Sequence, residues 1–155
     1  MSGGQPVSAR RLVTTEVDGR SRVLTDAPAP RTWCEEIWTT SATEPLGSAP
    51  STEPQPLVPP AGSTYVRVVQ LPPESVMRAA LASSGSAFDV DGAGFHKTST
   101  IDYVVVLDGP VELVLDDESV VVQPGEVVVQ RATSHAWRNH GDQPVRLLAV
   151  MTGVA

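Results

Sequence analysis

Two of the three histidines in this 155-residue chain, together with one aspartate, are of the types and at the spacing that could support acid–base chemistry. Counting by twos from His96 reaches Thr98 and then Asp102, so an extended backbone turns these side chains to one face. His135 opens a later predicted strand. An imidazole can take or give a proton near pH 7, and a carboxylate can orient it. We therefore predict that His96, Asp102 and His135 form an acid–base set, although Asp102 could instead be a structural hydrogen-bond acceptor.

Other residues could contact a small molecule bound beside this set. Arg67 interrupts a Val-rich strand, so its charge must face either water or a polar cavity. Trp137 lies two residues after His135, and it is either pocket wall or plain core. Arg138 could bind a substrate carboxylate, although arginine is more often found on the surface. The candidates for substrate contact are Thr98, Arg67, Trp137, Arg138 and Asn139.

The C-terminal half that carries these residues is predicted to be almost entirely β-strand. Short Val- and Leu-rich segments alternate with turn residues, a pattern typical of an antiparallel sandwich or barrel. Near-continuous apolar runs indicate strands that are covered on both faces or closed into a barrel. The predicted strands cover 100–107, 111–115, 120–123, 126–130, 135–138 and 145–152.

The N-terminal half is predicted to add strands, one loop and one short helix. The segments 11–15 and 21–25 flank Asp18-Gly19, which is a hairpin signal. Further strands are expected at 33–40 and 64–71, and the helix at 75–83. We expect residues 1–63 to pack as strands and a loop on a barrel formed by residues 64–155, so that the chain is one structural domain.

The segment 41–63 contains six prolines and almost no charge. Proline removes a backbone donor, so this segment cannot form a helix or a central strand. Two alternatives stay open: a mobile surface loop, or a lid draped over the mouth of the barrel.

The overall composition narrows the class of protein. Acidic residues outnumber basic ones by 18 to 11, and the formal net charge is −7, which disfavours binding to nucleic acid. We find no apolar run of the ~20 residues that span a bilayer, and no secretory signal. The single cysteine excludes an internal disulfide and a Cys-based zinc site. We expect a cytoplasmic protein with neither a membrane nor a nucleic-acid partner.

Two segments, GFHKTSTIDYVVVLDG and PGEVVVQRATSHAWRN, resemble the two motifs of the cupin superfamily, and the likeness covers about residues 94–152. The matching positions are His96 and Gly109 in the first motif and Gly125, His135 and Asn139 in the second. The resemblance implies an all-β fold, a cupin-type antiparallel β-barrel of the jelly-roll kind. The interval from Gly125 to His135 is one residue shorter than in the family pattern.

The first motif departs from the family at its metal ligands. Most cupins hold one divalent metal with three His and one Glu, but Thr98 stands at the second His and Asp102 at the Glu. Carried over by position, the resemblance implies one divalent metal (Fe, Mn, Ni or Zn) on His96, Asp102 and His135, the two-His, one-carboxylate set of non-haem iron sites. A hydroxyl is a weak ligand and Asp reaches less far than Glu, so a metal-free pocket is equally plausible.

The resemblance implies a biosynthetic enzyme that modifies a small molecule in the barrel pocket. The reactions expected are decarboxylation, dehydration or isomerisation (a lyase or isomerase), or oxygenation, on an organic acid or a polyketide-like substrate. We expect a carbonyl or enol oxygen to be polarised near His96 and His135. The alternative is a non-catalytic module that binds a small molecule. Cupins often pair through edge strands, so we also expect a homodimer.

Overall fold

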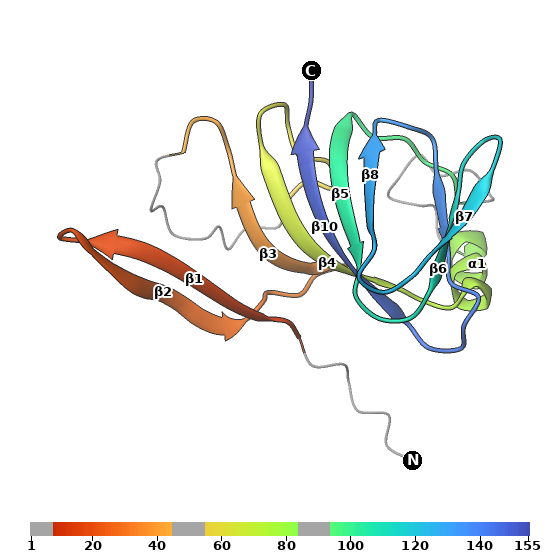
Figure 1. Ribbon diagram of the computed structural model, residues 1–155, viewed down its shortest axis with the longest axis horizontal. Helices are drawn as coiled ribbons and strands as arrows, with labels where there is room; N and C mark the ends of the chain where they lie inside the picture. The colour runs from red at the N-terminus through yellow and green to blue at the C-terminus, as the bar shows by residue number, and fades with distance from the viewer. Residues whose placement is uncertain (1–7, 45–54, 84–93) are drawn as a thin grey trace, which may run out of the picture.

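The computed structural model describes residues 8–44, 55–83 and 94–155. Eight strands form two antiparallel sheets, one of five strands in the order β3-β4-β10-β5-β8 and one of three in the order β7-β6-β9 (Figure 1). Their bounds are β3 Glu35–Thr40, β4 Thr64–Leu71, β5 Thr100–Val106, β6 Val111–Val114, β7 Ser119–Val122, β8 Val127–Arg131, β9 Ala136–Arg138 and β10 Val145–Gly153. This all-β antiparallel architecture confirms the predicted fold class.

The core lies along the inward faces of β5, β6 and β10. Side chains alternate between buried and less buried positions along these strands, as a pleated strand with one face inward requires. Fully burying one Val or Leu contributes about 1.5–3 kcal/mol. The buried apolar cluster consists of Leu71, Val104, Val106, Val111, Leu113, Val122, Val145, Leu147 and Ala149.

Strand β5 carries the predicted Asp102 into this interior. It lies between β10 and β8 in the larger sheet. Asp102 is two residues from Val104, so both side chains point to the same face of the strand, and both are buried. The counting argument made on the sequence therefore gives the correct face for Asp102.

The first two strands, β1 (Arg10–Val17) and β2 (Arg20–Pro28), form a separate hairpin. Its turn residues, Asp18 and Gly19, both have positive φ, at 52° and 72°, as a type I′ turn requires. The hairpin extends away from the sheets instead of packing on them (Figure 1). For the hairpin this differs from the packing expected of residues 1–63, and Leu12 and Val23 are accordingly both more than half exposed, whereas β3 does join the larger sheet.

The helix α1 (Glu74–Ser83) follows two prolines, close to its predicted bounds. Glu74 stands in the first turn, where a negative charge favours the helix dipole. The backbone N–H of Glu74 donates to the Asn139 carbonyl at 2.8 Å, and Met77 packs against the core. Among the described residues, no helix is long and apolar enough to cross a membrane.

Candidate active site

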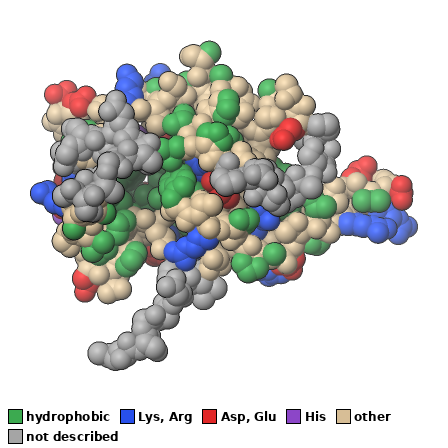
Figure 2. All heavy atoms as spheres, turned by 180° about the vertical axis from the view of Figure 1, so that it is seen from behind, with side chains coloured by type: hydrophobic (Ala, Val, Ile, Leu, Met, Phe, Trp, Pro, Cys, Tyr) green, Lys and Arg blue, Asp and Glu red, His purple; other side chains and the backbone are tan. Residues whose placement is uncertain are grey.

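A cavity of about 300 Å³ opens beside the inward face of the larger sheet. From behind, hydrophobic side chains gather around a hollow on this face of the molecule (Figure 2). Its apolar walls include Trp33, Leu57, Leu71, Met77, Val104, Trp137, Leu147, Ala149 and Met151. Its polar residues include His96, Thr98, Asp102, Gln130, His135 and Arg138. Three of the five predicted substrate contacts and all three predicted catalytic residues thus line one cavity.

The two cavity histidines are neighbours. His96 and His135 form an isolated antiparallel bridge, with reciprocal backbone hydrogen bonds of 3.0 and 3.1 Å. Their ring centroids are 4.3 Å apart and the ring planes are inclined by 59°. Backbone pairing therefore sets the two side chains next to each other in the cavity.

His135 is held as a neutral imidazole with a defined tautomer. Burial lowers its pKa from 6.5 to about 4, although the hydrogen bond to Thr133 opposes that shift. The Nδ1 atom lies 2.8 Å from the Thr133 carbonyl oxygen. A carbonyl only accepts, so Nδ1 carries the proton and the lone pair lies on Nε2. At neutral pH this side chain is a proton acceptor in an apolar cavity.

Asp102 is 6% exposed, and burial raises the pKa of its carboxyl group. A hydrogen bond from Thr100 and the proximity of His96 partly oppose that shift. The Oδ1 atom has no hydrogen-bond partner among the described residues. Thr98 also lines the cavity, and its hydroxyl is 2.7 Å from that of Thr100. The carboxyl group therefore keeps one acceptor position unused by the fold.

Sequence reasoning missed Gln130 as a cavity residue. It is 4% exposed, it lines the cavity, and it is the register partner of Asp102 across β5 and β8. Its Nε2 atom also has no partner within the described part of the chain. A signal was available, because Gln130 is a polar residue at the end of the apolar run Val127–Val129 and within the same strand.

The predicted metal ligands do not assemble into a three-ligand site. In residues 8–44, 55–83 and 94–155, no group of three or more His, Cys, Asp or Glu side chains is arranged to hold a metal ion. His96, Asp102 and His135 share a cavity, but the shorter Asp and the hydroxyl of Thr98 leave the family's ligand set incomplete. A divalent metal on these residues therefore stays a prediction from the resemblance.

Arg67 does not line the cavity. It is 0% exposed, and its guanidinium donates to both oxygens of Glu36 at 3.0 Å and to the carbonyls of Pro56 and Leu57. The same group stacks on Trp33 and on Tyr65, at 5.1 and 4.7 Å from the ring centroids. Arg67 therefore holds Pro56 and Leu57, near the end of the Pro-rich segment, against β4. Residues 45–54 lie outside the described residues, so the lid hypothesis stays a prediction.

Asn139 is also occupied within the protein. Its Nδ2 donates to the carbonyls of Leu71 and Gln143 at 3.0 and 2.8 Å, and its Oδ1 accepts from the Gly141 N–H at 2.9 Å. Asn139 is 1% exposed and does not line the cavity, so its hydrogen bonds fix the loop before β10. Its neighbours Trp137 and Arg138 do line the cavity.

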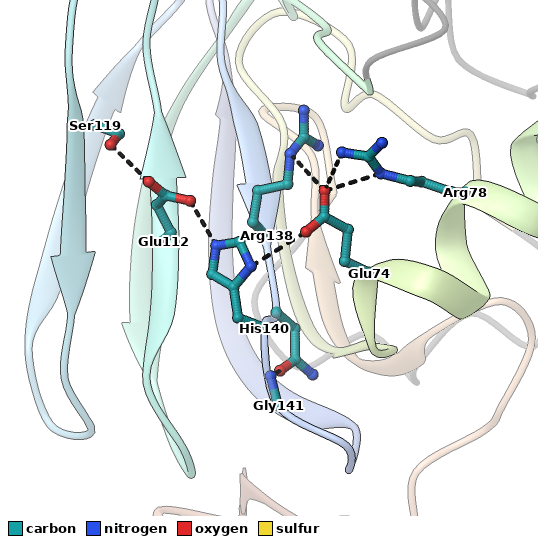
Figure 3. A network of polar contacts seen from close by, with 8 residues as sticks. Glu74, Arg78, Glu112, Ser119, Arg138, His140 and Gly141 are labelled. Atoms are coloured by element: carbon teal, nitrogen blue, oxygen red, sulfur yellow. Dashed lines mark hydrogen bonds and ion pairs between the residues drawn. The ribbon is translucent and has the colours of Figure 1, made fainter.

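The third histidine belongs to a different polar network, on the outside of the barrel (Figure 3). His140 lies between two carboxylates, with Nε2 at 2.6 Å from Glu112 and Nδ1 at 3.2 Å from Glu74. Its side chain is 60% exposed. Glu74 in turn pairs with Arg78 and Arg138, at 2.6 and 3.5 Å. This cluster joins α1 to β6, and Arg138 is the one residue named here that also lines the cavity.

A sequence model of the Cupin domain family (Cupin_2) matches residues 90–151. The match confirms the resemblance to cupins that the two motifs indicated. It spans most of β5 to β10 and includes every polar residue of the cavity named above.

Known relatives are similar over part of the chain. "Phomopsin biosynthesis cluster protein C'" of Diaporthe leptostromiformis is 58% identical over 45 residues, which are 28% of this chain and 24% of that protein. "Cupin-domain-containing oxidoreductase fogC" of Aspergillus ruber is 42% identical over 60 residues, 36% of this chain and 30% of that protein. The chain thus matches less than a third of the length of each of these relatives.

Solved structures are similar to part of the chain at low identity. The Cupin_2 domain of an XRE family transcriptional regulator from Enterobacter cloacae has a TM-score of 0.41 and 21% identity, covering 59% of this chain and 83% of that one. DMSP lyase DddQ from Ruegeria pomeroyi has a TM-score of 0.41 and 21% identity, covering 58% of this chain and 38% of that one.

Proposed function

We propose that this chain, whose residues 90–151 form a cupin domain, is a small-molecule tailoring enzyme that moves a proton on a carbonyl compound. The observation that carries the proposal is His135, a neutral imidazole whose Nε2 lone pair lies in a cavity with mostly apolar walls. At pH 7 such a base is in its unprotonated, proton-accepting form, and the apolar walls exclude the water that would compete for it.

The relatives support a role in small-molecule metabolism. One is named as a biosynthesis cluster protein and another as a cupin-domain-containing oxidoreductase. Since the described residues do not bring three metal ligands together, the proposal relies on acid–base chemistry of the lyase or isomerase kind. The metal-dependent oxygenase form of the prediction has its own test, which is metal analysis of protein purified without chelators or a nickel column.

In the proposed reaction, His135 Nε2 accepts a proton from the carbon next to a carbonyl. The electrons of the broken C–H bond move into the enolate, whose oxygen is polarised by the adjacent imidazole of His96. In an isomerisation the proton then returns from His135 to a different carbon. In a dehydration His135 gives the proton to the β-hydroxyl group, which leaves as water while the enolate electrons re-form the carbonyl and make a C=C bond. The apolar walls keep bulk water away from the enolate.

The test uses cyclohex-3-enone, a compact ketone whose isomerisation to the conjugated enone is followed by ultraviolet absorbance. The wild type should accelerate the reaction above the buffer rate, and His135→Gln should lower that acceleration by about 10²–10⁴-fold, the usual contribution of a general base. His140→Ala is the matched control, since it changes an exposed histidine outside the cavity and should react like the wild type. A wild type no faster than buffer, or an active His135→Gln variant, would contradict the proposal.

The alternative function is a non-catalytic module that binds a small molecule in the same cavity. The apolar walls serve both functions, whereas the neutral imidazole favours the enzyme. Saturable binding of the ketone without isomerisation would support the module.

A further inference from the structure

Two buried polar atoms at the cavity have no partner within the described residues. They are Oδ1 of Asp102, an acceptor, and Nε2 of Gln130, a donor. Both side chains line the cavity and both are more than nine-tenths buried, at 6% and 4% exposed. The two residues are directly opposite each other across the antiparallel strands β5 and β8. They do not bond to one another, so the fold leaves a donor and an acceptor side by side and unused.

Such a pair is unusual, because proteins satisfy about nine-tenths or more of their buried polar groups. Among the other polar side chains, Arg67 and Asn139, both at most 1% exposed, have their nitrogens engaged by the protein. Glu35 Oε1 and Arg11 Nε also have no partner among the described residues, but they do not line this cavity, where the donor and the acceptor occur as a pair. The two unpartnered atoms are therefore best explained by a ligand that supplies the missing partners, a donor for Asp102 and an acceptor for Gln130.

The ligand's chemistry can be narrowed by asking which groups carry a free donor beside a free acceptor. A carboxylate has no donor and would place a second negative charge beside Asp102. An enol or hydroxyl next to a ketone bonds to its own carbonyl. An open-chain secondary amide in the trans form points its N–H and C=O in opposite directions. A primary amide and a lactam each present N–H and C=O on one edge and cannot pair them internally.

We infer that Asp102 and Gln130 recognise the amide edge of a small, otherwise apolar substrate, with the N–H donating to Asp102 Oδ1 and the C=O accepting from Gln130 Nε2. This inference rests on the proposed function, since it names the substrate class of the same cavity. The amide is the group by which the molecule is held, and its apolar remainder lies along the cavity walls. Binding energy from such a remote group orients the reacting carbon for catalysis.

The test is calorimetric binding of three planar probes. Isoindolinone is a lactam and benzamide a primary amide, so they distinguish the two sources of the edge. Phthalide has the shape of isoindolinone with an oxygen in place of the N–H. Wild-type protein should bind isoindolinone, benzamide or both at least tenfold more tightly than phthalide, which is about one hydrogen bond.

Variants assign the preference to the two side chains. Asp102→Leu and Gln130→Met remove the acceptor and the donor at similar volume, and each should weaken binding of the preferred amide about tenfold. Asp102→Asn keeps an accepting oxygen and should bind within threefold of the wild type. His140→Ala, outside the cavity, is the control, and thermal denaturation checks that each variant is folded.

Equal binding of phthalide and isoindolinone, no binding of any probe, or unchanged binding in both Asp102→Leu and Gln130→Met would overturn the inference. Because the readout is binding, its failure is separate from failure of the proposed function. A preference for amides without isomerisation would support recognition by Asp102 and Gln130 and contradict the proposed proton transfer. Isomerisation that needs His135, without a preference for amides, would support the proton transfer and contradict the recognition.

Discussion

Two buried polar clusters lie on the same face of the larger sheet, and they differ in whether the protein satisfies them. In the first, Arg67 has its guanidinium surrounded by Glu36, two backbone carbonyls and two aromatic rings. In the second, Asp102 and Gln130 each keep one polar atom without a partner in the described chain, next to the neutral His135. Both clusters are almost inaccessible to water, so exposure does not distinguish them.

The difference separates a structural group from a functional one. A buried charge that is fully paired holds segments together, and removing one member leaves the other uncompensated. A buried polar atom without a partner destabilises the fold, and proteins retain such atoms where a ligand uses them. The following changes test this distinction, beginning with the largest expected effect.

Replacing Arg67 should have the largest effect on stability. Arg67→Met leaves Glu36 buried without its cation and leaves the carbonyls of Pro56 and Leu57 without a donor. We expect the free energy of unfolding to fall by about 3–5 kcal/mol, measured by urea denaturation. The double variant with Glu36→Gln should recover part of this loss, and a loss below about 1 kcal/mol for Arg67→Met alone would show that the cluster is not structural.

Replacing Asp102 should raise the free energy of unfolding, whereas replacing Arg67 should lower it. Asp102→Leu removes a buried carboxyl oxygen that has no partner among the described residues, and the new side chain fits the apolar surroundings. We expect the unfolding free energy at pH 7 to rise by about 1–3 kcal/mol, the cost of an unsatisfied buried group. A clear destabilisation in the same urea assay would mean that the carboxyl group is satisfied in solution and would remove the contrast between the two clusters.

His135 should make stability depend on pH. Its pKa is lowered from 6.5 to about 4 in the folded protein, so between these values the unfolded chain binds a proton that the folded chain does not. The contribution of the neutral His135 imidazole to the stability of the fold is present above pH 6.5 and is lost as the pH falls towards 4. Unfolding measured at pH 7 and at pH 4.5 should therefore show a larger loss in the wild type than in His135→Gln.

Asp102 serves as the control for this pH dependence because its raised pKa has the reverse consequence. Its contribution to stability is present below the ordinary value of 3.8 and is lost as the pH rises through the folded value. The free energy of unfolding of Asp102→Leu should thus increase relative to that of the wild type as the pH rises. Equal pH dependence in the wild type, His135→Gln and Asp102→Leu would show that neither group is buried in solution as described.

His140 should give the smallest effect. It lies between Glu74 and Glu112, but its side chain is 60% exposed, and exposed ion pairs contribute about 0–1 kcal/mol. We expect His140→Ala to change the unfolding free energy by less than about 1 kcal/mol and to leave amide binding unchanged. A loss comparable to that of Arg67→Met would show that the outer network, and not burial alone, holds α1 on the barrel.

Strand periodicity was sufficient to predict most of the fold. Alternation along β5 and the Asp18-Gly19 turn signal each follow from local backbone geometry. The outward path of the β1–β2 hairpin could not be predicted, because it depends on which surfaces meet in three dimensions. The homodimer and the cytoplasmic location stay predictions.

The candidate site was predicted only in part, for a physical reason. His96, Asp102 and His135 were found because their residue types are rare in Val-rich strands. That Arg67 and Asn139 make hydrogen bonds within the protein could not be predicted, because their partners are carbonyls elsewhere in the sequence, such as those of Leu57 and Leu71. The pairing of Gln130 with Asp102 depends on the register between β5 and β8, which one sequence does not specify.

The most direct test of His135 as the proton acceptor is the pH dependence of kcat/KM for cyclohex-3-enone, because this profile reports the pKa of the base in the free enzyme. Since burial lowers the pKa of His135 to about 4, kcat/KM should stay flat from pH 7.5 down to about 5 and fall only as the pH approaches 4. A fall centred near 6.5, the ordinary value for histidine, would contradict the assignment of a buried, neutral His135 as the catalytic base.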